Sequence, residues 1–304
     1  MTPEHIDEAH RSTTLSNKPR ISFAIPVRNG EDHISRALES LLAQDFEDFE
    51  IVVCDNASTD KTEVIVQHYK DRDKRIRYSR NAKDIGQIEN FNRVFKLSHG
   101  EYFRWVGADD WLEPSYARKC VTAIDARPDA VGVTTQWRYV DDEGHIDFNH
   151  VPGPRVDAPT PFKRLCQALL LLQTPPALLF DPIYSLIRRK SLEQTRLLPI
   201  NPWTDRLLAV ELCLLGSFSH LDDCLSTRRA AFERWKVRLP RYSKQLKEKR
   251  GHRVMLFVGY AAIVQRALNN GWQKLGCWLA IVYYWLREDV RRRAKRVTKR
   301  LKKR

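Results

Sequence analysis

Two adjacent carboxylates, Asp109 and Asp110, follow a short apolar run that is rich in aromatic residues. This run, at residues 101–106, is bounded by glycines and predicts a buried strand, and Glu113-Pro114 then favours the start of a helix. Carboxylate oxygens are hard ligands that hold Mg²⁺ or Mn²⁺ together with the phosphates of a substrate. The pair therefore predicts a metal site at the end of a strand, with an acidic turn that caps the next helix as the alternative.

Asp55 stands in a similar position, directly after a second apolar run at residues 49–54. It opens the cluster Asp-Asn-Ala-Ser-Thr-Asp, which combines turn formers with helix-capping residues. The carboxyl ends of parallel strands meet at one edge of a sheet, and open α/β sheets bind their ligands there. We therefore expect Asp55 and the Asp109-Asp110 pair to share one crevice, although Asp is also a residue favoured in turns.

Short apolar runs alternate with amphipathic segments through the first half of the chain. Runs at Ile21–Val27, 49–54, 76–79 and 101–106 predict strands, and Ala130–Val140 predicts one or two more. The spacing of apolar residues predicts helices at 33–43, 61–69, Gln87–Leu97 and 115–126. Strands separated by helices of this length indicate βαβ crossovers. We therefore expect an α/β fold with a doubly wound, mostly parallel sheet flanked by helices.

The second half of the chain is less regular. Four prolines between residues 152 and 161 indicate a linker, and a leucine-rich helix is predicted at 162–172. A short strand at 183–187 precedes Asn-Pro-Trp-Thr-Asp, which opens a predicted helix at 206–215. Gly216 is expected to end this helix as its C′ residue, before a last strand at 218–221.

The composition indicates a globular protein with a sizeable core, because 42% of the 304 residues are hydrophobic. The six cysteines form no C-x-x-C pair and mostly lie in apolar runs, which favours a reducing compartment. The nine histidines form no cluster with zinc-ligand spacing. Residues 1–20 have no apolar central region, so we expect a flexible arm there and not a secretory signal.

The net charge of +14 is distributed unevenly. Residues 236–304 hold 21 of the 52 Lys and Arg residues but 3 of the 38 acidic residues, a balance of +18. Residues 1–235 therefore carry a net charge of −4. The basic surplus belongs to a C-terminal appendage and not to the segment that holds the candidate site.

Four segments in this order resemble the family 2 glycosyltransferases of the GT-A fold, over about residues 21–229. They are ISFAIPVRNGEDHISRALESLLAQ, FEIVVCDNASTDKT, NAKDIGQIENFNRVFKLSHGEYFRWVGADD and NPWTDRLLAVELCLLGSFSHL. Each motif by itself is weak, but four in sequence at the spacing of the family are specific. The resemblance assigns residues 21–229 to a GT-A domain. The composition on either side indicates an arm at 1–20 and a basic, amphipathic helical appendage at 230–304.

The resemblance also implies roles for individual residues. Asp55 would bind the base or ribose of a nucleotide-sugar, in a pocket lined by Pro26 and Arg28. Asp109 and Asp110 would coordinate Mg²⁺ or Mn²⁺ on the donor diphosphate. The family's metal turn often begins with a further Asp where this chain has Gly107, so one potential ligand is missing.

Asp205 would be the general base that deprotonates the acceptor hydroxyl. An Asp near the start of a helix is also favoured by capping and by the helix dipole, which is the structural alternative. Asp141 and Asp142 are the second candidates for the base, although Asp-Asp-Glu-Gly is more typical of a hairpin turn. Arg228 and Arg229 follow the last predicted strand and are expected to form a solvated pair, with contact to the diphosphate in a closed state as the alternative.

The appendage contains two apolar runs, of 11 residues at 254–264 and 12 residues at 275–286. A membrane-spanning helix needs about 20 such residues. Residues 287–304 then carry 11 Lys and Arg against 2 acids. This pattern favours a segment that lies in the interface of an anionic membrane, with two core helices and a solvated tail as the alternative. Nucleic acid is a less favoured partner, because no recognised nucleic-acid-binding fold accompanies the basic tail.

These features together predict an inverting, metal-dependent glycosyltransferase of hexosyltransferase type. It would move a sugar from a nucleotide-sugar to a glycan or lipid-linked acceptor, as in bacterial polysaccharide biosynthesis, in the cytoplasm at the inner face of the cell membrane. One alternative is a catalytically inactive nucleotide-binding or scaffold module, which Gly107 makes conceivable. Another is a nucleotidyltransferase, but the turn after the first strand lacks the Gly/Lys/Arg-rich phosphate loop expected of that class.

Overall fold

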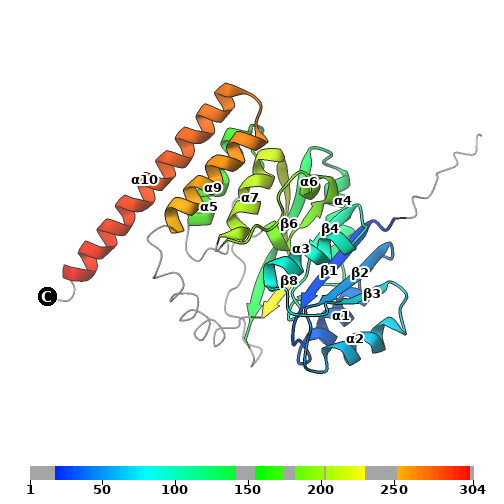
Figure 1. The fold of residues 1–304 in the computed structure, drawn as a ribbon. Helices are drawn as coiled ribbons and strands as arrows, with labels where there is room; N and C mark the ends of the chain where they lie inside the picture. The colour runs from blue at the N-terminus through cyan, green and yellow to red at the C-terminus, as the bar shows by residue number, and fades with distance from the viewer. Residues whose placement is uncertain (1–17, 142–154, 174–181, 202, 230–251, 302–304) are drawn as a thin grey trace, which may run out of the picture.

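The computed structural model describes residues 18–141, 155–173, 182–201, 203–229 and 252–301. Its centre is an eight-stranded sheet in the order β3-β2-β1-β4-β7-β6-β8-β5 (Figure 1). The strands are β1 (Ile21–Val27), β2 (Phe49–Asp55), β3 (Ile76–Arg80), β4 (Tyr102–Trp105), β5 (Trp111–Leu112), β6 (Ala130–Val140), β7 (Leu186–Arg188) and β8 (Ser217–Arg229).

The strand directions confirm the predicted α/β class. Strands β3, β2, β1 and β4 are parallel neighbours, and β6 is parallel to β8. Strand β7 runs antiparallel to both β4 and β6, and β5 runs antiparallel to β8. The register pairs Val27 with Asp55 and Ala24 with Trp105, so the carboxyl ends of β1, β2 and β4 lie at one edge of the sheet.

Helices cover both faces of the sheet. Helices α1 (Ile34–Leu42), α2 (Thr62–Lys70) and α4 (Tyr116–Asp125) bury their apolar residues in the core on one face. The core on the other face takes residues from α3 (Gln87–Leu97), α5 (Pro161–Gln173), α7 (Thr204–Leu215), α9 (His252–Ala267) and α10 (Gly271–Leu301). A 3₁₀ turn, η1 (Pro182–Tyr184), and a short helix, α6 (Arg189–Glu193), flank β7.

Alternation along the central strands explains why both faces need helices. In β1, Phe23 and Ile25 face the α1–α4 core, whereas Ala24 faces the other core. In β4, Phe103 and Trp105 join the core that contains α3, and Tyr102 joins the opposite one. Because successive side chains of a strand point to opposite faces, a strand that is apolar throughout requires a cover on both sides.

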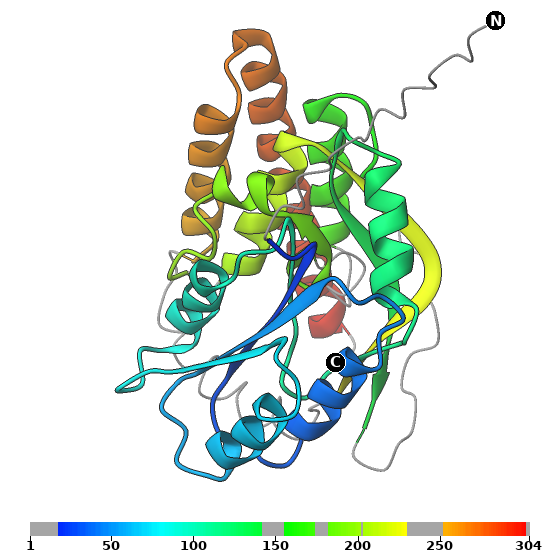
Figure 2. The same cartoon turned by 90° about the vertical axis from the view of Figure 1, so that its right-hand side faces the viewer.

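The C-terminal helices pack on the same core as α5 and α7. Ile263 and Val264 of α9 and Cys277 and Ile281 of α10 are buried in it. Figure 1 shows α9 and α10 at the opposite end of the molecule from α1 and α2, and Figure 2 gives the view from the side. The core-helix alternative is thus correct for one face of each helix. Among the described residues, no helix combines the length and the apolar character needed to span a membrane.

Several elements differ from the sequence prediction. The predicted strand at 183–187 is the 3₁₀ turn η1 followed by β7, and α6 was not predicted. Strand β8 continues to Arg229, well past the predicted 218–221, because it pairs with most of the long strand β6. Strand β5 was not predicted, since it has only two residues and exists through its pairing with β8. The predicted N-terminal arm up to residue 17, the stretch 142–154 and residues 230–251 lie outside the described residues.

Gly216 ends α7 as expected, but for a different reason. Its backbone is extended (φ −170°), so it is not a left-handed C′ residue. A Cβ at this position would lie 2.6 Å from Cγ1 of Val131 and 2.9 Å from the carbonyl oxygen of Asp129. Close packing against the start of β6 therefore requires the glycine.

Candidate active site

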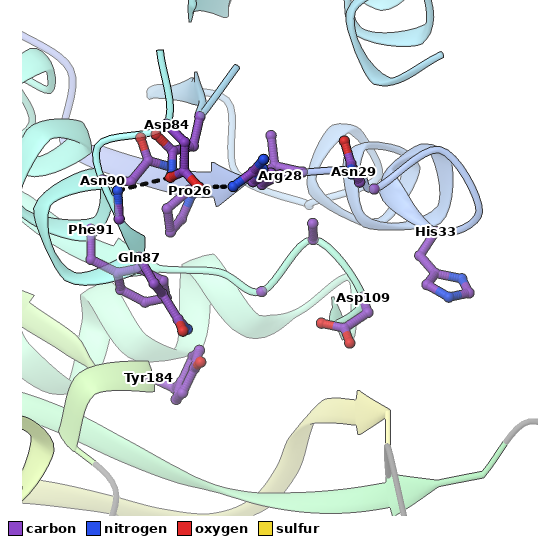
Figure 3. A pocket seen from close by; sticks show the side chains of 16 residues that line it. Pro26, Arg28, Asn29, His33, Asp84, Gln87, Asn90, Phe91, Asp109 and Tyr184 are labelled. Atoms are coloured by element: carbon purple, nitrogen blue, oxygen red, sulfur yellow. Dashed lines mark hydrogen bonds and ion pairs between the residues drawn. The ribbon is translucent and has the colours of Figure 1, made fainter. Parts of the chain in front are cut away.

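A cavity of about 660 Å³ opens at the sheet edge where β1, β2 and β4 end. Its walls come from the loops after these strands, from the start of α3 and from η1 (Figure 3). The residues that line it are Pro26, Val27, Arg28, Asn29, Gly30, His33, Asn56, Asp84, Gly86, Gln87, Asn90, Phe91, Gly107, Ala108, Asp109 and Tyr184. Three of the predicted site residues, Pro26, Arg28 and Asp109, are thus brought together.

Hydrogen bonds tie the loop after β1 to the loop after β2. The amide of Asn29 donates to Oγ of Ser58 at 2.9 Å, and the amide of Gly30 donates to Oγ1 of Thr62 at 2.8 Å. In return, the amide of Thr59 donates to Oδ1 of Asn29 at 2.9 Å. Asn29 has a left-handed backbone (φ 52°), which Asn tolerates better than most residues. The two loops are therefore held together by hydrogen bonds and form one wall of the cavity.

Asp55 supports this wall from the interior and is not among the residues that line the cavity. Its side chain is fully buried. Oδ1 accepts hydrogen bonds from the amide and hydroxyl of Ser58, at 2.8 and 2.6 Å, and Oδ2 accepts one from the hydroxyl of Tyr78 at 2.7 Å. Burial, together with the hydrogen bond to Asp55, raises the pKa of Tyr78. The next residue, Asn56, reaches the cavity in its place.

Asp84 is a cavity residue that the sequence did not single out. It forms an ion pair with Arg28 and accepts a hydrogen bond from Nδ2 of Asn56 at 2.6 Å (Figure 3). Behind it, Nδ2 of Asn81 donates to Oδ1 of both Asn56 and Asn90, at 3.0 and 2.9 Å. These amides connect β2, the end of β3 and α3. Nothing in the spacing of residues within the segment NAKDIGQIEN distinguishes Asp84.

The two carboxylates of the turn after β4 both approach Gly107 but differ in their access to the cavity. Asp109 lines the cavity, whereas Asp110 does not and has 9% of its surface exposed. A Cβ on Gly107 would lie 2.6 Å from Oδ2 of Asp110, so the Asp110 carboxylate occupies the space beside the glycine. The family often has a further Asp at position 107. In this chain the Asp110 carboxylate lies where a side chain at position 107 would begin.

Two arginines accompany Asp110 in the interior. Arg104 on β4 is 2% exposed and packs over the ring of Tyr116 at 4.2 Å. Arg228, near the end of β8, is 8% exposed and stacks on Tyr184 at 4.2 Å. Burial and the charge of Asp109 raise the pKa of Asp110 to about 7, while Arg228 and Arg104 act in the opposite direction. The prediction that Arg228 is solvated is wrong.

The donor set around the cavity fits a divalent metal ion that is shared with a ligand. No three His, Cys, Asp or Glu side chains converge anywhere in the part of the chain that the structure describes. Mg²⁺ in phosphate sites is commonly held by one or two carboxylates, with phosphate oxygens and water completing its shell. Asp109 at the cavity supplies one such carboxylate, with Asp110 beside it in sequence.

Asp205 lies in a second, smaller hollow of about 200 Å³. This hollow shares Gln87, Phe91 and Tyr184 with the larger cavity, so the two adjoin. Asp205 is exposed in the first turn of α7. The fold therefore brings the predicted base next to the cavity that holds Asp109, across a long separation in sequence.

The remaining candidates lie outside these two hollows. Asp141 follows the end of β6 and lines neither of them, and Asp142 is outside the described residues. Nη1 of Arg229 lies 2.5 Å from Nδ1 of His33, which lines the larger cavity. Nothing in the sequence distinguishes His33, because its contact with Arg229 forms only when the start of α1 meets the end of β8.

Comparison with known proteins is consistent with this geometry. The model of glycosyl transferase family 2 matches residues 22–196, more than half of the chain. A chondroitin synthase of Escherichia coli is 34% identical over 148 residues, which are 48% of this chain and 21% of that protein. An uncharacterized glycosyltransferase of Nostoc sp. is 30% identical over 217 residues, 69% of this chain and 64% of that protein. The chain thus spans less than two thirds of the length of these relatives.

Solved structures show the same fold. TarS 1-349 from S. aureus in complex with UDP superposes with a TM-score of 0.63 at 19% identity, covering 86% of this chain and 70% of that one. The mannosyltransferase PcManGT from Pyrobaculum calidifontis, in complex with GDP-Man and Mn²⁺, gives a TM-score of 0.55 at 18% identity, covering 88% and 70%. The fold is of the GT-A type, and the chain belongs to glycosyl transferase family 2.

Proposed function

We propose that this glycosyltransferase moves a hexosyl group from a nucleoside diphosphate-sugar to an acceptor hydroxyl, with inversion at the anomeric carbon. The observation that carries the proposal is the pair of adjoining hollows. Asp109 lies in one and Asp205 in the other, and Gln87, Phe91 and Tyr184 form their common wall. This arrangement suits a donor and an acceptor that meet at one reacting carbon.

The larger cavity is the proposed donor site. The fold neighbours were solved with UDP, UDP-GlcNAc and GDP-Man, which supports a nucleotide-sugar in the corresponding place. Pro26, Arg28 and Asn56 would contact the nucleoside. Asp55 was expected to bind the base or ribose. Its carboxylate is buried and accepts hydrogen bonds from Ser58 and Tyr78. We therefore propose that Asp55 positions the loop after β2, which forms part of the cavity wall.

Asp109 is the proposed ligand for Mg²⁺ or Mn²⁺, and Asp110 is the second candidate. A bound metal ion neutralises the negative charge of the departing nucleoside diphosphate. Support comes from the position of Asp109 at the cavity and from Mn²⁺ in the complex of the mannosyltransferase. The burial of Asp110 between Arg104 and Arg228 makes Asp109 the better placed of the two.

Asp205 is the proposed general base. A sugar hydroxyl is a weak nucleophile, and a carboxylate within reach of its proton assists its attack. Inversion follows from a single displacement, by analogy with inverting glycosidases, in which one carboxylate serves as base. The exposed position of Asp205 beside the apolar side chains of Ile88 and Leu198 supports this role.

The proposed acceptor is a glycan or a lipid-linked glycan, and the proposed location is the cytoplasmic face of a membrane. Sequence similarity to a chondroitin synthase supports a polysaccharide acceptor. The balance of +18 over residues 236–304 supports attraction to an anionic membrane surface.

Thermal unfolding in the presence of nucleotides tests the donor site. UDP, GDP, dTDP and CDP are each compared with and without Mn²⁺, on the native chain, on Asp109→Ala and on the exposed control Asp71→Ala. Ligand at about 100 times its Kd stabilises by ~2.7 kcal/mol, which raises the unfolding temperature by several degrees. We expect a metal-dependent shift for one nucleotide that Asp71→Ala keeps and Asp109→Ala loses. No shift with any nucleotide would favour the inactive module, and release of pyrophosphate during turnover would favour a nucleotidyltransferase.

A further inference from the structure

Helix α10 is apolar on two opposite sides. Its inner side buries Cys277, Ala280 and Ile281 against the core that it shares with α5 and α9. Its outer side carries apolar residues at intervals of three or four, the spacing that places side chains on one side of a helix. We call this outer row the α10 stripe. It consists of Trp272, Leu275, Leu279, Val282, Leu286 and Val290.

The α10 stripe is exposed along its whole length. Trp272 is 82% exposed, Leu279 62% and Val290 67%, and no other part of the described chain covers them. In Figure 1, α10 forms the outer border of the molecule, with α9 between it and α7. Scattered apolar residues on a surface are ordinary, but a row of six on one side of one helix is typical of an interaction surface.

The same helix continues into the most basic segment of the chain. Helix α10 runs from Gly271 to Leu301, and residues 287–304 contain 11 Lys and Arg against 2 acids. An apolar row followed by a basic run along one helix is the pattern of helices that lie in the interface plane of a membrane. Each Lys or Arg near an anionic lipid surface contributes attraction within about a Debye length.

We propose that the α10 stripe docks on an anionic bilayer, with α10 lying in the plane of the headgroups and the rest of the protein attached to its inner side. The proposal rests on the membrane location proposed above and names the surface that achieves it. Charge decides between a bilayer and a second copy of the chain. The net charge of +9 on residues 287–304 attracts anionic lipid and repels the same segment of another copy.

Vesicle co-sedimentation of the full chain tests the proposal without any requirement for glycosyl transfer. The vesicles contain either phosphatidylcholine alone or phosphatidylcholine with phosphatidylglycerol. The test variant is Leu275→Ser/Leu279→Ser/Leu286→Ser. The matched control is Val64→Ser/Ile200→Ser, which changes two apolar residues that are 70% and 79% exposed on other elements. Unfolding curves of both variants verify that the fold is kept, which is expected because all five side chains are exposed.

We expect the native chain and the control to bind the anionic vesicles, more weakly as salt is raised. The triple variant should bind about tenfold or more weakly, because apolar burial in the interface is lost. As a second measurement, brominated lipids should quench the fluorescence of the native chain more than that of Trp272→Phe. Equal vesicle binding by the triple variant and the native chain would overturn the proposal.

Two other outcomes would also overturn it. The native chain could fail to bind anionic vesicles at low salt. Alternatively, light scattering could show a dimer that the triple variant converts to a monomer, which would make the stripe an interface between two copies. The nucleotide panel is independent of all three outcomes, so failure of the membrane surface is distinguishable from failure of the proposed donor site.

Discussion

Glu211 of helix α7 forms an ion pair with Arg266 of helix α9, although the Glu211 side chain is only 4% exposed. One turn and a half earlier, α7 carries Asp205, the proposed base. Gly259 of α9 approaches the same helix so closely that a Cβ would lie 2.7 Å from Cδ2 of Leu207. Helix α9 thus packs directly against α7, the helix that carries Asp205 in its first turn.

Replacement of Arg266 by Met is expected to destabilise the protein by about 2 kcal/mol. Breaking a buried pair leaves an uncompensated charge and costs about 3–5 kcal/mol when both partners are buried. The cost here is smaller because the Arg266 side chain is 39% exposed. Urea denaturation measures the change, and Glu211→Gln in the Arg266→Met background should recover part of it. Arg118→Met, which breaks an exposed pair with Asp45, is the control and should have a much smaller effect.

Removal of all residues after Arg229 is expected to prevent stable folding. It would expose the core positions that Ile263, Val264, Leu268 and Ile281 cover, each of them at most 5% exposed. Each buried side chain of this kind contributes about 1.5–3 kcal/mol, and their sum approaches the ~5–15 kcal/mol that stabilises a typical domain. A chain that ends after residue 286 keeps these contacts and should unfold near the native temperature. Equal unfolding temperatures for both truncations would contradict the shared core.

Asp205→Asn is expected to lower turnover by a factor of about 10²–10⁴, since the amide cannot accept the acceptor proton. Donor binding should remain, because Asp205 lines the smaller hollow and not the larger one. Release of nucleoside diphosphate measures turnover, and the nucleotide-dependent unfolding shift measures binding. The control is Asp141→Asn, the alternative base, which should keep its activity. Loss of nucleotide binding in Asp205→Asn would disprove the assignment.

Gly107→Ala is expected to weaken metal-dependent nucleotide binding by about tenfold, equivalent to ~1.4 kcal/mol. The added methyl group would lie 2.6 Å from Oδ2 of Asp110 and 3.1 Å from Oδ1 of Asp109, so both carboxylates must move. Calorimetric titration with the preferred nucleotide and Mn²⁺ gives the change. Gly271→Ala is the matched control, because no atom outside its own stretch of chain lies within 4 Å of its Cβ position. Unchanged affinity in Gly107→Ala would show that the turn adapts freely.

Glu50→Gln is expected to lower the free energy of unfolding near pH 7. It should also make that free energy fall less steeply as the pH is lowered. Burial acts to raise the pKa of the Glu50 carboxyl, but hydrogen bonds from Ser22, the His99 amide and Arg77 outweigh it and keep the pKa below its usual range. A lowered pKa in the folded state stabilises fully above the unfolded value, and this contribution disappears as the pH falls through the folded pKa.

Unfolding curves between pH 7 and pH 3 measure this difference. At pH 7 the variant should lose about 1–3 kcal/mol, the usual cost of a poorly satisfied buried group. As the pH falls below the ordinary pKa of a glutamate, the native chain should lose stability faster than the variant. Glu101→Gln, with a half-exposed carboxylate on the surface, is the control and should follow the native curve. Parallel curves for Glu50→Gln and the native chain would refute the assignment.

The sequence by itself determined most strands of the sheet and the edge at which the candidate site lies. Apolar runs such as Ile21–Val27 are strands because their pattern is local, and the Asp109-Asp110 turn follows from the run before it. The four motifs also identified the family, which the match over residues 22–196 confirms. These features depend on neighbours along the chain, so their signal is present before folding.

The tertiary structure alone decided the direction of each carboxylate and the partners that surround the site. Asp55 faces the interior, Asp84 pairs with Arg28, and Arg228 is buried against Tyr184. Whether α9 and α10 join the core could not be read from two apolar runs either, because both packing and membrane contact favour such runs. In each case a side chain contacts a partner more than 20 positions away in the sequence. The two come close only when the sheet and its helices assemble.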